Sequence, residues 1–320
     1  GATRAAAPAV RADRVRPARE PPRTLRDVPL DELPLPEGAP AYRRAQLVDW
    51  LYVKAAADPR AMTSLPLAMR EWLAAEHVLD PFESVRRFPS RDGSVRYLFT
   101  LRDGQRTEAV YMPYPGRRTV CVSSMVGCPA GCAFCATGAL GFGRNLTRGE
   151  IVGQVLAVAR HEGIEPRSVR NLVLMGMGEA LLNYREALAA IRTLIDPRAL
   201  AMSPRRITVS TVGLPSRIRQ LADEGLPLVL AVSLHAPDDE TRRRIIPTAL
   251  ANPVAEIVEA MRYWRERVGR RVTIEYTLLA GVNDSDEQAR ELADLVRGLG
   301  AHVNLIPFNP WSGSGFEQSS

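Results

Sequence analysis

The chain has 320 residues, 46% of them hydrophobic, which is enough apolar material to bury a full-sized core in one large domain, or in a large and a small one. Its net charge of +6 arises mostly in residues 1–26, where seven arginines face only Asp13 and Glu20, so the high pI does not by itself indicate a basic nucleic-acid surface on the folded part. We find no signal peptide and no apolar span of about 18 residues, which argues against a secreted or membrane protein, and four cysteines, three of them close together, fit a reducing cytoplasm.

The N-terminal part of the chain divides into two stretches of different composition. Residues 1–40 are rich in Ala, Arg and Pro, and this predicts a mostly disordered tail because too few apolar side chains are available for a core. Residues 41–80 predict a small helical domain that contacts RNA in the family considered below. Apolar residues recur there at helical spacing over 42–54, and a second helix is expected after Pro66.

Residues 81–115 predict a β-hairpin extension. Short strands are expected at about 85–88, 95–101 and 107–112. The dipeptides Asp92-Gly93 and Asp103-Gly104 separate them and are typical of hairpin turns.

Residues 116–320 alternate between strands and helices. Strands are predicted at 119–124, 171–176, 206–211, 228–234, 271–278 and 302–307. Helices are predicted at about 147–161, 184–195, 214–224, 253–267 and 285–298. Parallel strands joined by crossover helices predict an α/β fold, an incomplete (β/α)6 TIM-like barrel. Catalytic groups gather at the C-terminal ends of the strands in such barrels.

Three cysteines lie on one short Gly-rich loop after the first barrel strand. Cys128, Cys132 and Cys135 have the spacing C-x3-C-x2-C, and three soft thiolates on one loop suit a [4Fe-4S] cluster. Three protein ligands leave one iron open to an amine and a carboxylate, the pair that S-adenosylmethionine (SAM) offers. A structural zinc site remains an alternative, although it normally needs four protein ligands and only Cys121 lies nearby. A disulfide with spare thiols would instead suit a secreted protein.

Several longer motifs follow one another along the barrel. The cluster loop reads Arg-Thr-Val-Cys-Val-Ser-Ser-Met-Val-Gly up to Cys128. The later motifs are Met175-Gly-Met-Gly-Glu179, Ile207-Thr-Val-Ser-Thr-Val-Gly213, Ser233-Leu-His-Ala-Pro237 and Val303-Asn-Leu-Ile-Pro-Phe-Asn-Pro310. In this order they resemble the RlmN/Cfr family of radical SAM enzymes, and the similarity runs from about residue 42 to about residue 317. The resemblance implies a radical SAM barrel that uses a [4Fe-4S] cluster and SAM.

The resemblance also implies which residues bind the cofactors. Cys128, Cys132 and Cys135 are expected to hold the cluster. The residues expected to contact SAM are Gly178, Glu179, Ser210, Ser233, Leu234, His235 and Asn309. Without the resemblance, a buried Ser or His bonded to the backbone is the preferred interpretation of Ser210, Ser233 and His235, and Asn309 would be a turn residue. Ala180 departs from the family, which usually has Pro there.

Four further polar residues each allow two interpretations. The resemblance implies that Cys121 resolves a covalent enzyme–RNA intermediate and that Glu108 assists proton removal. On the chemistry of the residues alone, a buried, inert thiol and a solvated strand carboxylate are the preferred interpretations. Arg144 and Asn145 follow the cluster loop and either reach SAM or RNA or form a surface salt bridge.

The resemblance implies methylation of C2 of an adenine in RNA, at adenine 2503 of 23S rRNA and, in many members, adenine 37 of some tRNAs. C8 methylation in the manner of Cfr and a non-enzymatic, zinc-bearing RNA-binding protein are the alternatives. We expect a cytoplasmic monomer that receives electrons from flavodoxin or ferredoxin. The family carries its methyl group on a Cys about forty residues beyond the position of Asn309, so we expect that the printed sequence, which ends at Ser320, is truncated.

Overall fold

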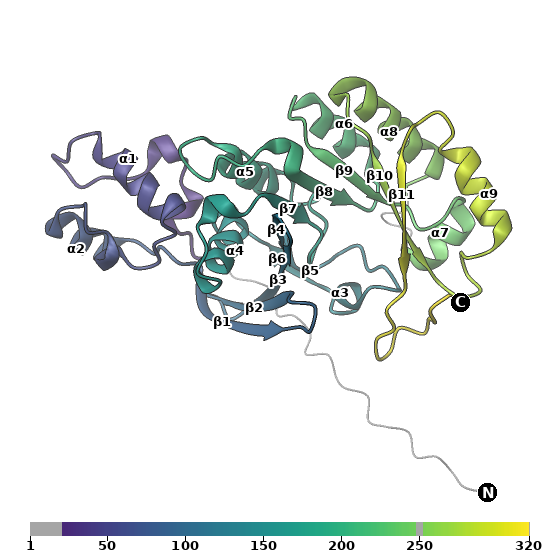
Figure 1. Ribbon diagram of the computed structural model, residues 1–320, viewed down its shortest axis with the longest axis horizontal. Coiled ribbons are helices and arrows are strands. Elements are labelled where there is room, and N and C mark those ends of the chain that lie inside the picture. Colours follow the sequence, from purple (N-terminus) through teal and green to yellow (C-terminus); the bar gives the residue numbers. More distant parts are fainter. Residues whose placement is uncertain (1–20, 248–251, 320) are drawn as a thin grey trace, which may run out of the picture.

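The computed structural model describes residues 21–247 and 252–319 (Figure 1). One large sheet contains nine strands in the order β1-β2-β3-β4-β7-β8-β9-β10-β11. The two end strands, β1 and β11, each have a single neighbour, so the sheet remains open. No helix within the described ranges is long and apolar enough to cross a membrane.

The six strands that end this order run parallel and confirm the predicted partial (β/α)6 barrel. They are β4 (Arg117–Cys121), β7 (Asn171–Leu174), β8 (Ile207–Thr211), β9 (Val229–Ser233), β10 (Thr273–Leu278) and β11 (His302–Pro307). The helices that follow the strands are α4 (Arg148–His161), α5 (Tyr184–Ile195), α6 (Pro215–Asp223), α7 (Asp239–Ile245), α8 (Val254–Val268) and α9 (Asp286–Leu295). The capping box of Thr147 and Glu150 opens α4.

The three remaining strands continue the same sheet. β1 (Phe82–Pro89), β2 (Val95–Leu101) and β3 (Arg106–Tyr114) are antiparallel, and β3 pairs with β4. Both predicted turns occur, with Gly93 at φ +84° and Gly104 at φ +79°, angles that glycine adopts at little cost. The hairpins therefore extend the barrel sheet.

The helices of the N-terminal region project to one end of the molecule (left in Figure 1). They are α1 (Arg43–Val48), which continues as a π-helical turn over Asp49–Val53, and α2 (Leu67–Glu76). Short 3-10 helices lie at Leu25–Asp27, Leu30–Glu32, Pro59–Ala61, Pro166–Ser168 and Pro204–Arg206.

The expectation of a disordered tail is wrong for residues 21–33. Leu25, Leu30 and Leu33 are buried in the main core, and the guanidinium of Arg26 donates to the carbonyl of Ala56 at 2.7 Å. These few apolar side chains are sufficient because the segment packs on surfaces built by other parts of the chain. The rest of the predicted tail, residues 1–20, lies outside the described residues.

The barrel strands separate apolar from polar side chains. On β8, Ile207 and Val209 are buried in the main hydrophobic core, whereas Ser210 lines a cavity. On β9, Leu230 is likewise buried in the core and Ser233 lines the cavity. Because successive side chains of a strand point to opposite faces, this alternation leaves a polar interior for ligands.

Candidate functional site

A small clasp of two strands brackets the cysteine loop. β5 (Met125–Gly127) and β6 (Phe142–Asn145) pair antiparallel, and between them lie the three cysteines and the short helix α3 (Ala136–Ala139). The backbone N–H of Cys128 donates to the carbonyl of Gly141 at 2.9 Å. Gly127 has φ +70°, and a Cβ there would overlap the Gly141 carbonyl, so glycine is required for the clasp to close.

The three thiols open onto one cavity of about 240 Å³. Burial, together with the charges of neighbouring groups, raises the pKa of Cys128 to about 11 and that of Cys132 to about 12. All three thiols are free. Cys128 and Cys132 therefore stay protonated until a positive metal group enters, which is the behaviour expected of metal ligands.

The arrangement of the thiols fits a polynuclear cluster. Within residues 21–247 and 252–319, no three His, Cys, Asp or Glu side chains are placed to hold one metal ion together. A tetrahedral zinc needs its sulfur ligands about 2.3 Å from one point. Cys128, Cys132 and Cys135 all line one cavity, and three thiolates from one loop suit the [4Fe-4S] group.

Glu179 forms part of the cavity wall where β7 ends. Its carboxylate is buried, with Oε2 accepting the N–H of Val212 at 2.7 Å and Oε1 accepting the N–H of Leu181 at 2.9 Å. Burial raises the pKa of Glu179 to about 7, although these hydrogen bonds lower it. A bound cation would favour the ionised form, so the site suits an ammonium group.

Gly178 brings this loop close to the cysteine clasp. It has φ +105°, and an added Cβ would lie 2.6 Å from Cβ of Met125 and 2.8 Å from Oγ of Ser124. The nearby Ser123 joins three segments, because its hydroxyl donates to the carbonyl of Glu108 at 2.5 Å and accepts the N–H of Met177 at 2.8 Å. The loop is therefore fixed against β5 and β3.

We expect Gly178→Ala to lower SAM affinity by about tenfold or more, because Met125 or the loop must shift to admit the methyl group, and about 1.4 kcal/mol is tenfold. Isothermal titration of SAM into the reconstituted protein measures this. Gly163→Ala is the matched control, since Gly163 also has a positive φ, +63°, but open space around it. Equal SAM affinity in the two variants would contradict the close packing of Gly178.

His235 presents a neutral ring to the cavity. Burial lowers its pKa to about 3, with Arg242 adding to the effect, so the ring carries a single proton. Nδ1 accepts the N–H of Thr277 at 2.9 Å, which places that proton on Nε2. The ring packs edge-on against Phe134 with centroids 4.7 Å apart, and the residue is held at φ +58°. Such strain is frequent where a side chain is held for a ligand.

The structure brings together most of the predicted site residues. The cavity lining includes all three loop cysteines and, from the predicted SAM contacts, Gly178, Glu179, Ser210, Ser233 and His235. Leu234 is buried outside this lining, and its N–H donates to the carbonyl of Glu275 at 3.1 Å. Asn309 is exposed beyond β11 and also lies outside the lining.

Cys121 and Glu108 lie on neighbouring strands, away from the cavity lining. Val110, two residues after Glu108, stands opposite Cys121 in the pairing of β3 with β4. Burial raises the pKa of Cys121 to about 11, and a backbone hydrogen bond at Met175 lowers it in part. Glu108 is half-buried and pairs with Arg96. Their predicted catalytic roles stay predictions.

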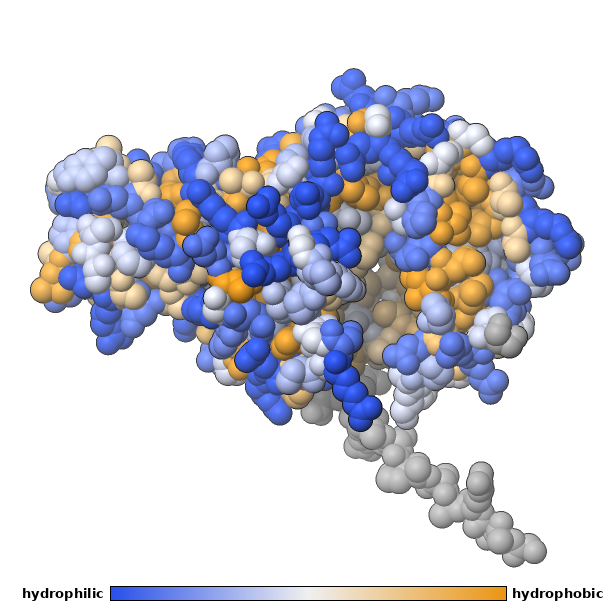
Figure 2. Space-filling view, in the orientation of Figure 1, coloured by the Kyte–Doolittle hydropathy of each residue, from blue (hydrophilic) through white to orange (hydrophobic). Residues whose placement is uncertain are grey.

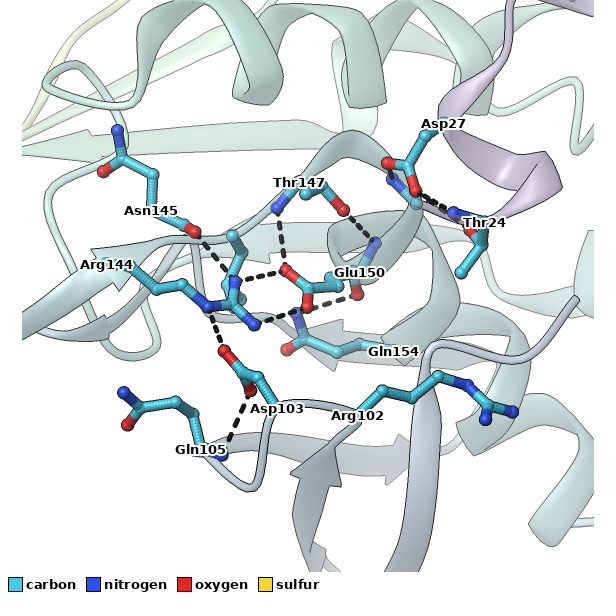
Figure 3. Close-up of polar contacts among 12 residues, drawn as sticks. Thr24, Asp27, Arg102, Asp103, Gln105, Arg144, Asn145, Thr147, Glu150 and Gln154 are labelled. Carbon is cyan, nitrogen blue, oxygen red and sulfur yellow. Dashed lines mark hydrogen bonds and ion pairs between the residues drawn. The ribbon is translucent and has the colours of Figure 1, made fainter. Parts of the chain in front are cut away.

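Arg144 does not face a ligand. Its side chain is 7% exposed and forms two ion pairs, from Nε to Asp103 at 2.6 Å and from Nη2 to Glu150 at 2.8 Å (Figure 3). Glu150 also accepts the N–H of Thr147 at 2.9 Å. Arg144 therefore joins the β2–β3 turn, β6 and the start of α4, and the expected surface salt bridge is a buried one.

Sequence reasoning missed Glu275, which also lines the cavity. It lies on β10 between Ile274 and Tyr276, and the side-chain amide of Asn304 donates to its Oε2 at 2.7 Å. A single carboxylate inside an otherwise apolar strand was the available signal. Charged groups are seldom buried without a partner or a function.

A hollow marks one face of the molecule beside β11 (Figure 2). Hydrophobic side chains gather along it, and Leu305 of β11 is 56% exposed. A second and larger groove of about 1110 Å³ lies outside the barrel, along α5. It holds none of the residues predicted for catalysis, SAM or metal, but Arg144 and Asn145 are part of its lining, which contains seven arginines and three acidic residues in all.

Comparison with known proteins completes the description of the site. Residues 122–293 match the family model of the Radical SAM superfamily. A protein of Thermus thermophilus named "Probable dual-specificity RNA methyltransferase RlmN" is 63% identical over 288 residues, covering 89% of this chain and 81% of that protein. A protein of the same name from Deinococcus deserti is 58% identical, covering 92% and 85%. The crystal structure of a radical SAM methyltransferase from Sphaerobacter thermophilus is 46% identical, with a TM-score of 0.89, covering 93% of this chain and 89% of that chain.

Proposed function

Since this chain belongs to the RlmN family of radical SAM enzymes, we propose that it methylates C2 of an adenine in RNA, using a [4Fe-4S] cluster and SAM. The observation that carries the proposal is the single cavity shared by three free thiols, Glu179 and His235. Adenine C2 has little nucleophilic character, so a radical route is needed. Cluster and SAM together supply that route through a 5′-deoxyadenosyl radical.

The residues of the chain would hold and orient these groups. Cys128, Cys132 and Cys135 would bind three irons. Glu179 would accept the SAM ammonium while its carboxylate stays fixed by two backbone N–H groups. His235 would donate a hydrogen bond from Nε2 to SAM. The hydroxyls of Ser210 and Ser233 would bind the SAM carboxylate and ribose.

The RNA would meet the protein outside the cavity. The groove along α5 is the surface we assign to the phosphate backbone, because Arg23 and Arg217 reach it without a carboxylate partner in the described part of the chain. The N-terminal helices α1 and α2 are the second proposed contact. The target base must leave its stack to be modified.

The finer features are also proposals. The printed names of the relatives include dual specificity, and we propose that both rRNA and tRNA are substrates. A flavodoxin or ferredoxin in the cytoplasm would supply the electron, and the enzyme would act as a monomer. Cys121 and Glu108 would complete the reaction after the methylene carbon has joined the base.

The test has two parts. Anaerobic reconstitution with SAM and dithionite is expected to give a brown protein with about four irons per chain and to release 5′-deoxyadenosine. The gene that encodes this chain is then expressed in a host whose RNA lacks 2-methyladenosine. Nucleoside mass spectrometry should detect 2-methyladenosine in rRNA and tRNA. Detection of 8-methyladenosine would support the Cfr-like alternative, and a colourless zinc protein would overturn the proposal.

A further inference from the structure

Arg242, on α7, is a fully buried cation that has no carboxylate partner. Its exposed fraction is 0%, and its guanidinium donates to three carbonyl oxygens, those of Leu234 at 3.2 Å, Asn252 at 3.4 Å and Val212. Among the residues described, no Asp or Glu lies within 4 Å of it. Burial lowers the pKa of Arg242 to about 10, so the group is still charged at neutral pH.

Arg242 lies beside the cysteine loop, because Ile245, one turn further along α7, accepts the N–H of Ala133 at 2.8 Å. Negative charge at Cys132 favours the Arg242 cation, and the charge of Asp239 does so to a smaller extent. The other fully buried arginine of this kind, Arg26, differs, because its strongest favourable neighbour is Asp80. Arg144 has two carboxylates of its own. Arg242 therefore differs from both, because no carboxylate among the described residues forms an ion pair with it and the cysteine loop lies beside its helix.

Helix α7 is fixed to that loop by backbone and apolar contacts. The N–H of Ala133 donates to the carbonyl of Ile245 at 2.8 Å. Cys132 packs on a hydrophobic cluster that contains Ile245, Ile246 and Phe308. The position of the guanidinium relative to the thiols is thus set by the fold.

Two of the three carbonyl partners of Arg242 belong to further loops of the cavity. Leu234 stands between Ser233 and His235, both of which line the cavity. Val212 also lines it and donates its own N–H to Glu179. One side chain therefore joins the ends of β8 and β9 beside the cysteine loop.

The buried charge of Arg242 would affect the charge state of a cluster held by the cysteine loop. A buried cation without a counter-ion costs several kcal/mol, and among the described residues only the more distant charge of Asp239 offsets part of this cost. Three thiolates on a [4Fe-4S]2+ group leave a net charge of −1, and reduction by one electron makes it −2. A cation fixed nearby in a medium of low dielectric constant favours the more negative state.

We propose that Arg242 is a positioning residue for the iron–sulfur cluster, whose buried positive charge offsets the thiolates and raises the reduction potential of the cluster. The proposal rests on the proposed function, since it presumes that the three cysteines hold a cluster. It concerns the cluster alone and not the RNA that is methylated.

The test compares Arg242→Met and Arg242→Lys in the anaerobically reconstituted protein. Redox titration followed by electron paramagnetic resonance measures the cluster potential, and iron analysis measures occupancy. We expect Arg242→Met to shift the reduction equilibrium about tenfold toward the oxidised cluster, which is 59 mV for one electron. Arg242→Lys keeps the charge and should retain most of the wild-type potential. Arg243→Met, next to it but exposed and paired with Asp239, is the control and should change nothing.

Each outcome decides the proposal. An Arg242→Met protein with full iron and the wild-type potential would overturn it. If Arg242→Met does not fold or holds no iron, the Arg242→Lys variant decides. An Arg242→Lys protein that keeps its iron supports a role for the charge. Loss of iron from the Arg242→Lys protein as well shows that the shape of the arginine side chain, and not its charge, matters. A wild-type protein that binds no iron would instead defeat the proposed function, so the two failures are distinguishable.

Discussion

Cys132→Ala is expected to lose its iron and to stop releasing 5′-deoxyadenosine from SAM. Cys132 is one of three thiols around the cavity, and two remaining thiolates cannot hold a cubane against exchange with solvent. Replacing a residue that only hydrogen-bonds to a metal ligand lowers metal affinity or activity by about 10- to 100-fold. Removing a ligand itself should therefore lower them by more than about 100-fold. Iron analysis and chromatography of the SAM cleavage products measure the two effects.

Cys121→Ala is the matched control for this experiment. Cys121 is the remaining cysteine of the printed sequence and lies outside the cavity lining. The variant should keep its iron and its SAM cleavage, since its proposed role comes only after the RNA has reacted. Full iron and unchanged cleavage in Cys132→Ala would show that the three cysteines are not the cluster ligands.

Arg144→Met is expected to lower the free energy of unfolding by about 3–5 kcal/mol. The side chains of Asp103 and Glu150 are only 10% and 4% exposed, and both lose their cation in this variant. Glu150 also forms the capping box of α4, so the start of that helix is left with an unpaired buried charge (Figure 3). Urea unfolding followed by circular dichroism measures the change.

Asp294→Asn provides the comparison for an exposed ion pair. Asp294 and Arg297 have side chains 69% and 78% exposed, and such pairs contribute less than about 1 kcal/mol. If Arg144→Met cost no more than Asp294→Asn, the buried network would not contribute to stability as its geometry indicates.

The barrel could be predicted because its signals are local. Strands of four to six residues alternate with amphipathic helices, and each predicted strand and helix of residues 116–320 overlaps an observed one. The short elements α3, β5, β6 and α7 were not predicted. The thiols could be found for the same reason, since Cys128, Cys132 and Cys135 lie within one loop. The spacing alone indicated the ligand set before any tertiary contact was known.

What the sequence did not reveal depends on contacts between distant segments. The partner of Arg144 is Asp103, 41 residues earlier, and the carbonyl partners of Arg242 lie in three separate loops. Leu25, Leu30 and Leu33 gave too weak a pattern among the surrounding prolines to predict burial. Glu275 was overlooked because its role in the cavity wall follows from which face of β10 it occupies.

The unpaired edges of the sheet affect how an RNA substrate could reach the cavity. β1 and β11 do not pair with each other, so the sheet that surrounds the cavity is not closed into a ring of strands. A fully closed ring of strands admits only small molecules that arrive along its axis. With one side left unsealed, a nucleobase still attached to a folded polynucleotide can be delivered edgewise, and the scaffold need not unfold or dilate at each turnover.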